Sequence, residues 1–143
     1  MYFTSLDFFV PDVSEPLALP LSDEQVSAGF PSPAEDVMDR ALDLNKELIK
    51  HPASTFYARV KGMSMMDEGI HHGDLLVIDK SLSPTNGCLA VCYIDGEFTL
   101  KRVQIEKDHL LLVPANSNYQ PIRVTAENDF LIWGIVQYVI KKV

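Results

Sequence analysis

The sequence predicts a mainly β protein: a compact, mostly antiparallel β-body with one short N-terminal helix and an extended N-terminal arm. Three observations predict it. Short runs rich in β-branched and aromatic residues recur from Thr55 onward. Gly, Asn-Gly and Asp-Gly turn signals separate these runs, and prolines crowd the first part of the chain. With 143 residues and 47% apolar composition, the chain is long enough for one domain with a real core.

The arm covers residues 1–32 and the β-body with its helix covers residues 33–143. Prolines forbid a long helix in the arm and favour extended segments; they are Pro11, Pro16, Pro20 and Pro31. Apolar residues recur too often here for a purely solvated tail. The arm is therefore interpreted either as a strap over one side of the body or as an extended segment that enters a groove.

A helix signal follows the arm. Ser32-Pro33-Ala34-Glu35 has the pattern of a capping box with a first-turn proline. One apolar stripe continues from it through Val37, Ala41, Leu44 and Leu48. Asp43 is a competing N-cap, which would start the helix there and leave the earlier part extended. Pro52 limits the helix at its far end.

From Thr55 the apolar pattern is that of strands. We expect strands at Thr55 to Val60, Leu75 to Ile78, Leu89 to Ile94, Glu97 to Ile105, Leu110 to Val113, Ile122 to Val124 and Ile132 to Ile140. Asp95-Gly96, between two of these runs, predicts a hairpin with a type I′ turn, because both central residues of that turn need positive φ.

Charge and composition argue against a DNA-binding protein, a membrane protein and a secreted protein. Eight acidic residues and no Lys or Arg precede Arg40, and these eight residues account for the net charge of −8. An acidic arm on a neutral body lacks the basic face that binds phosphate backbones, so no direct DNA binding is expected. No apolar run is long enough to span a membrane and no signal peptide is evident, so a cytoplasmic protein is expected.

Metal and disulfide chemistry are not expected either. Cys88 and Cys92 have no second pair, and His71 and His72 have no third ligand nearby. We interpret the cysteines as reduced apolar residues and the histidines as surface or turn residues. No metal and no cofactor are therefore expected.

Two residues form a candidate catalytic pair. Ser64 lies in the small-residue turn Gly62-Met63-Ser64-Met65, and Lys101 lies on a strand-like segment. A neutral lysine can take the proton of a serine hydroxyl, and burial is the usual way to make a lysine neutral. On the expected strand, Thr99, Lys101 and Val103 share a face, so Lys101 has apolar neighbours. Three rival lysines, Lys61, Lys80 and Lys107, are close in sequence to Ser64 or at loop edges.

A candidate scissile bond lies in the arm. Ala28 and Gly29, within Val26-Ser27-Ala28-Gly29-Phe30, form the least hindered peptide bond in their neighbourhood. The missing Cβ of Gly29 lets a nucleophile come close. An ordinary glycine turn before the next element is the alternative interpretation.

These three motifs, in this order and spacing, resemble the self-cleaving serine/lysine peptidases of the LexA/UmuD (peptidase S24-like) family. Further segments, among them Phe30-Pro31-Ser32-Pro33-Ala34, Asp95-Gly96-Glu97-Phe98-Thr99 and Pro114-Ala115-Asn116-Ser117, look specifically like its UmuD branch. Only 28 residues precede Gly29, too few for the helix-turn-helix domain of a LexA-like repressor. The resemblance implies the C-terminal fold of the family.

It also implies roles for individual residues. Ser64 would be the nucleophile on Ala28, Lys101 the general base, and the backbone N–H groups of Met63 and Ser64 the oxyanion hole. The resemblance further implies an SOS role: cleavage stimulated by a RecA filament on single-stranded DNA. The expected product is a homodimer that acts as accessory subunit of an error-prone translesion polymerase, with a Y-family catalytic subunit (UmuC-like).

Two other classes stay open. One is a non-catalytic β-rich interaction module with a permanent strap, in which Ser64 is a turn residue and Lys101 a solvated strand residue. The other is a signal-peptidase-like enzyme that acts on other proteins, against which the lack of a membrane anchor argues.

Overall fold

The computed structural model describes residues 4–21, 40–62, 69–114 and 120–143. Its contacts divide the chain into two units, residues 1–11 with 51–143, and residues 12–50. Each unit is described by itself below. The boundary expected between Ser32 and Pro33 lies outside the described residues, so the division into arm and β-domain stays a prediction.

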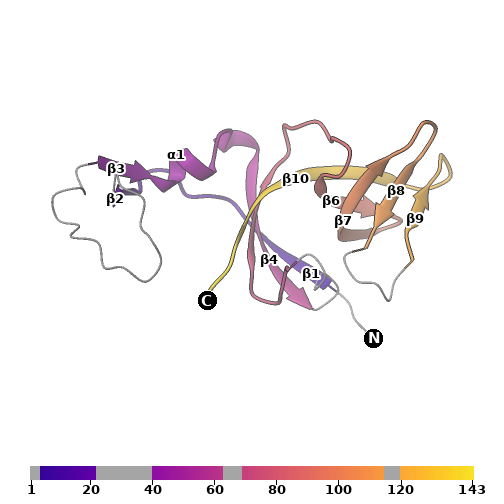
Figure 1. Cartoon of the computed structure of the whole chain (residues 1–143), viewed down its shortest axis with the longest axis horizontal. Coiled ribbons are helices and arrows are strands. Elements are labelled where there is room, and N and C mark those ends of the chain that lie inside the picture. The colour runs from indigo at the N-terminus through magenta and orange to yellow at the C-terminus, as the bar shows by residue number, and fades with distance from the viewer. Residues whose placement is uncertain (1–3, 22–39, 63–68, 115–119) are drawn as a thin grey trace, which may run out of the picture. The chain divides into compact units, whose positions relative to one another are not determined.

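The first unit is built on one eight-stranded sheet. Its strands are β1 (Thr4–Phe9), β4 (Thr55–Gly62), β5 (Leu75–Asp79), β6 (Leu89–Ile94), β7 (Glu97–Ile105), β8 (Leu110–Val113), β9 (Ile122–Val124) and β10 (Phe130–Ile140). They lie in the order β1-β4-β5-β10-β6-β7-β8-β9, and every neighbouring pair is antiparallel (Figure 1). The short 3-10 helix η2 (Pro52–Ser54) precedes β4. The mainly antiparallel β fold predicted from the sequence is confirmed.

The predicted hairpin between β6 and β7 is confirmed as well. Asp95 and Gly96 have φ values of 47° and 92°, the positive φ that a type I′ turn requires at both central positions. Ile94 pairs with Glu97 directly across the turn. The turn therefore fixes the register of every later pair between the two strands.

Two buried clusters lie on opposite sides of the sheet, because neighbouring residues of a strand point to opposite faces. The first cluster contains residues of β4, β5, β6 and β7 and comprises Ala58, Val60, Ile70, Leu76, Ile78, Leu89, Val91 and Leu100. The second comprises Ala90, Cys92, Val103, Leu112, Val124 and Ile135. Val60 of β4 and Leu100 of β7 share the first cluster although three strands separate β4 from β7 in the sheet. The sheet is therefore curled.

The strand β1 was not among the strands expected from the sequence. It pairs along its whole length with β4, from Thr4 opposite Gly62 to Phe9 opposite Tyr57. For residues 4–9 this pairing agrees with the interpretation of the arm as a strap on the body. Residues 26–30, which the groove interpretation concerned, lie outside the described part of the chain.

The second unit contains a two-stranded sheet and the short helix. β2 (Ala18–Leu21) pairs antiparallel with β3 (Arg40–Asp43), and α1 (Leu44–Leu48) follows directly. The Oδ1 atom of Asp43 accepts hydrogen bonds from the backbone N–H groups of Asn45 at 3.0 Å and Lys46 at 3.4 Å. The helix thus has its N-cap at Asp43.

A helix that runs from Ser32 through Leu48 is therefore wrong for residues 40–43, and the alternative start at Asp43 is right. The physical reason is that the backbone of residues 40–43 pairs with β2, which the apolar spacing does not reveal. The Ser32-Pro33-Ala34-Glu35 capping box and Val37 lie outside the described residues.

Candidate functional site

Lys101 lies in the middle of β7, directly opposite Ala90 of β6. The expected strand from Glu97 to Ile105 is confirmed to the residue. Val103 belongs to the same cluster as Ala90, whereas Leu100 belongs to the cluster on the other face. The alternation predicted from the sequence is confirmed, and it places the Lys101 side chain on the face of the second cluster.

The surroundings of Lys101 disfavour its charged form. Its side chain is half-buried, and this burial lowers the pKa of the ammonium below its ordinary value, with a small opposing effect from Cys92. Within the described part of the chain, no hydrogen bond or ion pair joins Lys101 to another residue. A half-buried amine with a lowered pKa and no counter-ion there is suited to accept a proton.

Cys92, which lies on this face and acts on the pKa of Lys101, does not offer a counter-charge. It is fully buried, and burial raises the pKa of its thiol to about 12, with Cys88 raising it further and Lys101 lowering it. The thiol is therefore protonated at neutral pH and is no thiolate nucleophile. Sequence reasoning took Cys92 as a small apolar residue, but its place beside Lys101 depends on the strand register.

The three rival lysines lie in different surroundings. Lys61 is exposed and forms an ion pair with Asp7, with 2.6 Å between Nζ and Oδ2. Lys80 is exposed, and its Nζ lies 4.8 Å from the centre of the Trp133 ring. Lys107 is exposed beyond the end of β7. None of them shares the half-buried position that lowers the pKa of Lys101.

The other predicted site residues, Met63, Ser64, Ala28 and Gly29, lie outside the residues that the structure describes. The segment before Met63 is nevertheless well defined: β4 ends at Gly62, whose φ of 105° is left-handed and favours glycine.

Backbone hydrogen bonds tie the end of β4 to the start of β5. The N–H of Gly73 donates to the carbonyl of Val60 at 2.8 Å, and the N–H of Val60 donates to the carbonyl of Asp74 at 2.9 Å. The N–H of Gly62 donates to Nδ1 of His72 at 3.4 Å. These contacts hold residues 60–62 against residues 72–74. Because Val60 and Leu100 share one cluster, the end of β4 belongs to the same core as the strand of Lys101.

Two buried carboxylates were missed by the sequence reasoning, since nothing in the local pattern marks them as buried. Asp74 accepts hydrogen bonds from Nζ of Lys141 at 2.5 Å and from the backbone N–H of His71 at 2.9 Å. Burial raises its pKa, but these contacts outweigh burial and the net effect is a lowered pKa. These contacts of Asp74 anchor the end of β10 to the turn before β5.

Asp79 is the second buried carboxylate. It accepts hydrogen bonds from the backbone N–H and Oγ of Ser81 at 2.8 and 2.7 Å and from Oγ of Ser54 at 3.0 Å, and it pairs with Nδ1 of His51. Burial raises its pKa, but these bonds outweigh burial and lower the pKa to about 2. Both serine hydroxyls donate to the carboxylate, and that of Ser54 also donates to the backbone carbonyl of His51 rather than to its ring, so the arrangement is a structural junction and not a catalytic triad.

The two adjacent histidines are exposed, as expected for turn residues. Nδ1 of His71 lies 3.0 Å from Nζ of Lys141. Across the described ranges, no group of three or more His, Cys, Asp or Glu residues is placed to hold a metal ion.

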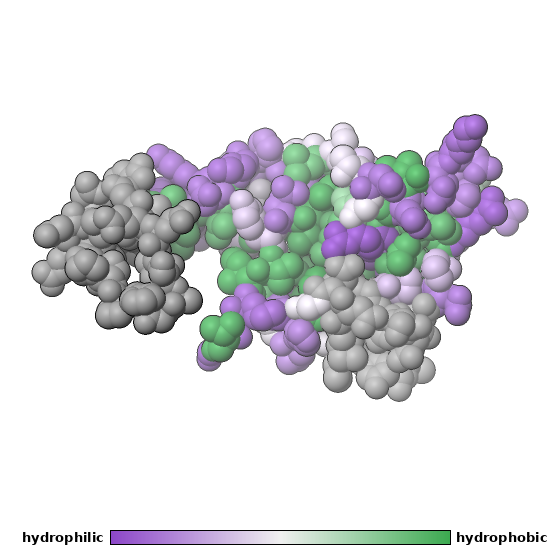
Figure 2. All heavy atoms as spheres, in the orientation of Figure 1, coloured by the Kyte–Doolittle hydropathy of each residue, from purple (hydrophilic) through white to green (hydrophobic). Residues whose placement is uncertain are grey.

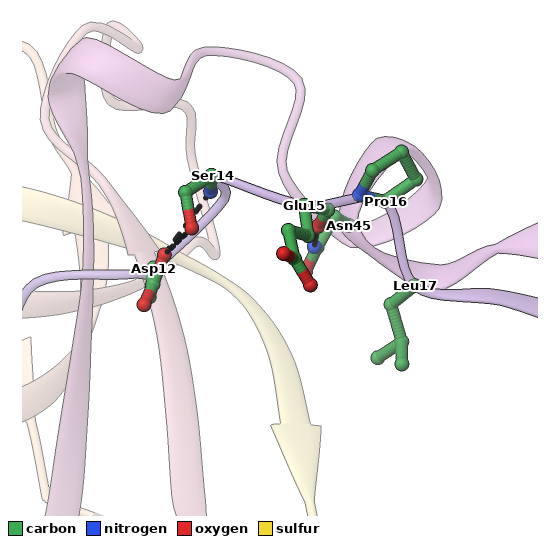
Figure 3. Close-up of a pocket in the computed structure, with 6 residues that line it drawn as sticks. All are labelled: Asp12, Ser14, Glu15, Pro16, Leu17 and Asn45. Atoms are coloured by element: carbon green, nitrogen blue, oxygen red, sulfur yellow. Dashed lines mark hydrogen bonds between the residues drawn. The ribbon is translucent and has the colours of Figure 1, made fainter.

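A hollow in the second unit is lined by Asp12, Ser14, Glu15, Pro16, Leu17 and Asn45 (Figure 3). Its polar groups bond to one another: the N–H and Oγ of Ser14 donate to Oδ1 of Asp12 at 3.0 and 2.6 Å, and Nδ2 of Asn45 donates to the carbonyl of Glu15 at 2.9 Å. These are turn and cap contacts, and the bonds from Ser14 lower the pKa of Asp12, which makes this exposed carboxylate a weak base. We therefore place the candidate site at Lys101.

The chain matches a known protein family and several known proteins. Residues 20–137 match the family described as Peptidase S24-like. The chain is similar to Protein SamA of Salmonella typhimurium, with 42% identity over 86% of this chain and 85% of SamA. It is also similar to Protein MucA of Escherichia coli, with 37% identity over 85% of this chain and 83% of MucA. Protein ImpA of Shigella flexneri shares 39% identity over 86% of this chain and 83% of ImpA.

A repressor is also similar to the chain. LexA repressor 1 of Xanthomonas campestris is 39% identical over 83% of this chain, which corresponds to 58% of the repressor. In the part of the chain that the structure describes, no helix is long and apolar enough to cross a membrane.

Proposed function

The chain belongs to the Peptidase S24-like family, and from this premise we propose that it is a serine peptidase that cleaves itself between Ala28 and Gly29. The observation that carries the proposal is the state of Lys101. It is half-buried on the face of Ala90 and Cys92, its pKa is lowered, and it has no counter-ion among the described residues.

In this mechanism Oγ of Ser64 attacks the carbonyl carbon of Ala28. Neutral Lys101 takes the hydroxyl proton and later delivers a proton to the amine of Gly29 as the peptide bond breaks. The backbone N–H groups of Met63 and Ser64 stabilise the oxyanion, an interaction whose loss costs about 3 to 4 kcal/mol of barrier per donor. Water then hydrolyses the ester between Ser64 and Ala28.

The biological role that we propose is that of the UmuD branch. Cleavage is stimulated by a RecA filament on single-stranded DNA during the SOS response. The product, residues 29–143, forms a homodimer that serves as accessory subunit of a Y-family translesion polymerase. The support is the match of the three sequence motifs to UmuD, together with identity to SamA, MucA and ImpA along most of the chain.

Slow cleavage without the filament follows from the need to bring Ala28 to Ser64. If only a small fraction of molecules holds the scissile segment in place, the rate falls by that fraction. A filament that favours the engaged arrangement then accelerates cleavage without adding a catalytic group. A higher pH accelerates it independently, because it increases the neutral fraction of Lys101.

The test is mass spectrometry of the purified chain after incubation with activated RecA filament, and separately at alkaline pH. The wild type should yield a fragment that begins at Gly29, and Ser64→Ala and Lys101→Ala should yield none. Lys61→Ala and Lys107→Ala are matched controls that remove an exposed lysine and should cleave like the wild type. An intact wild-type chain under both conditions would favour the non-catalytic interaction module instead.

A further inference from the structure

β1 occupies an edge of the sheet that would otherwise be free. Among the described strands of the sheet β1 is terminal, and it is hydrogen-bonded to β4 on one side (Figure 1). The pairing covers six residues of each strand, from Thr4 opposite Gly62 to Phe9 opposite Tyr57. Without β1, β4 would present unpaired backbone N–H and C=O groups, which readily pair with another extended chain.

One face of β1 is apolar and lies against the core. Leu6 pairs with Val60 and Phe8 with Ala58, and both Leu6 and Phe8 pack on the first buried cluster. The ring of Phe8 meets the Trp133 ring edge-on, with 4.8 Å between centroids, and lies 5.3 Å from the ring of Phe98. We call the edge of β4 together with the rings of Trp133 and Phe98 the β4 groove.

Part of this groove remains at the surface even with β1 in place. Phe98 is 42% exposed, and hydrophobic residues reach the surface over the eight-stranded sheet in the view of Figure 2. Removal of the Phe8 ring would uncover more of the Phe98 and Trp133 rings. Contiguous apolar surface of this kind is typical of interaction sites.

The other face of β1 carries a charge that matches β4. Asp7 lies opposite Arg59 in the ladder and forms an ion pair with Lys61. Both basic side chains belong to β4 and are exposed. The groove is therefore complementary to an extended segment in which an acidic residue stands between an aliphatic and an aromatic residue, as in Leu6-Asp7-Phe8.

We propose that the β4 groove is a strand-docking site for a partner protein, and that β1 is its resident occupant in the uncleaved chain. The partner supplies an extended segment with the pattern aliphatic, acidic, aromatic, which adds to β4 as an antiparallel strand. Backbone hydrogen bonds supply affinity in this mode, and the alternating side chains supply specificity.

The inference rests on the proposed function for one point, namely that β1 leaves the groove after cleavage. While the chain is intact, β1 is tethered, and a tethered segment acts at an effective concentration in the millimolar range. Cleavage between Ala28 and Gly29 cuts the tether. The fragment of residues 1–28 is then held by strand pairing alone, of β1 with β4 and of β2 with β3, and when it dissociates it leaves the groove to the partner.

The test uses the full chain and its single tryptophan, Trp133, as the reporter. The probe is a synthetic peptide of residues 4–11, which contains no tryptophan. It is titrated into a Leu6→Ser, Phe8→Ser double variant in which β1 holds the groove weakly. The matched control is Phe9→Ser, which changes the neighbouring ring on the opposite face of β1. All proteins also carry Ser64→Ala, so the result does not depend on whether the chain cleaves.

We expect a saturable change in Trp133 emission for the double variant and binding at least about tenfold weaker for the control, in which β1 still competes. A folded double variant without a saturable change would overturn the proposal. So would equal binding to both proteins, because the peptide would then bind elsewhere. If circular dichroism shows the double variant to be unfolded, Phe8→Ala takes its place under the same two criteria.

The charge preference has its own test. A peptide with Asp7→Lys should bind the double variant about two- to fivefold more weakly, the effect of an exposed ion pair. Its affinity should recover when Lys61→Asp is added to the protein. If the affinity is unchanged in both titrations, the acidic residue is not part of the pattern that the partner must supply.

Discussion

Lys101 and Ala90 lie opposite each other in the ladder between β6 and β7, so the cross-strand partner of the lysine carries a methyl group rather than a carboxylate. A methyl group offers neither charge nor hydrogen bond. The nearby thiol of Cys92 stays protonated at neutral pH, because burial raises its pKa to about 12. Among the described neighbours nothing compensates the ammonium, which is why burial lowers its pKa.

Placing a carboxylate beside Lys101 should reverse this effect. Thr99 lies two residues away on the same face of β7. We expect Thr99→Asp to raise the pKa of Lys101 and to slow self-cleavage at neutral pH by about three- to tenfold. The rate should recover at higher pH, so the pH profile of cleavage should move in the alkaline direction. The measurement is the cleavage rate as a function of pH without filament.

The matched control is Gln104→Asp, an exposed change of equal charge on the opposite face of the same strand. It should leave the pH profile in place. An equal shift in both variants would show a general charge effect rather than a local one at Lys101.

Lys101 should also weaken the fold. Because its pKa is lower in the folded state than in the unfolded state, the unfolded chain binds more protons between the two values, and stability rises with pH there. Below the folded pKa the full penalty is present. Lys101→Met should therefore be more stable than the wild type at neutral pH, with a difference that shrinks toward about pH 10.5.

Urea unfolding of both proteins at several pH values measures this difference. A Lys101→Met protein that is less stable than the wild type at neutral pH would contradict the assigned environment of Lys101. Loss of cleavage in the same variant would show that a stabilising change at this position removes activity.

Asp79, in contrast to Lys101, should stabilise the fold at neutral pH. Its pKa is lowered to about 2, so it stabilises the fold above the unfolded pKa of about 4, and this contribution is lost as pH falls through about 2. Asp79→Asn should destabilise the protein by about 1 to 3 kcal/mol at neutral pH, because the bonds from Ser54 and Ser81 lose their charged acceptor. The difference from the wild type should narrow in acid.

Chemical unfolding of the wild type and Asp79→Asn, at neutral pH and in acid, gives the difference in unfolding free energy under both conditions. Asp108→Asn is the control, since Asp108 also pairs with a histidine, His109, but is exposed. We expect no measurable change from it. A constant effect of Asp79→Asn down to about pH 2 would argue against a lowered pKa of Asp79 in the folded state.

Gly134 allows the close approach of β10 and β5. A Cβ added at this position would lie 2.5 Å from Cγ2 of Ile78, and the register of β10 shifts beside it, between Ile132 and Gly134. Gly134→Ala should destabilise the protein by about 1 to 3 kcal/mol through overpacking. The thermal midpoint is the readout.

Ile78→Leu removes the methyl group on Cβ that the added atom would meet. In the double variant with Gly134→Ala we expect smaller destabilisation than the sum of the two single changes. If the free-energy changes of the two single variants simply add in the double variant, the strain does not arise between position 134 and Ile78.

Much of the fold follows from local signals. The strand from Glu97 to Ile105, its turn at Asp95-Gly96 and the face of Lys101 could be predicted because period-2 alternation and the positive φ of a type I′ turn are properties of a few neighbouring residues. The N-cap at Asp43 is equally local, because its carboxylate bonds to the next turn of backbone. The motifs of the self-cleaving family are also short segments, so their resemblance could be recognised from the sequence.

The sequence by itself thus determined the β class, the register of the central hairpin and the choice of Lys101. Only the tertiary structure decided that Asp74 and Asp79 are buried and that β1 pairs with β4. Each of these contacts joins segments far apart in the chain. Strand pairing and burial depend on which segments meet in the curled sheet, and no local periodicity contains that information.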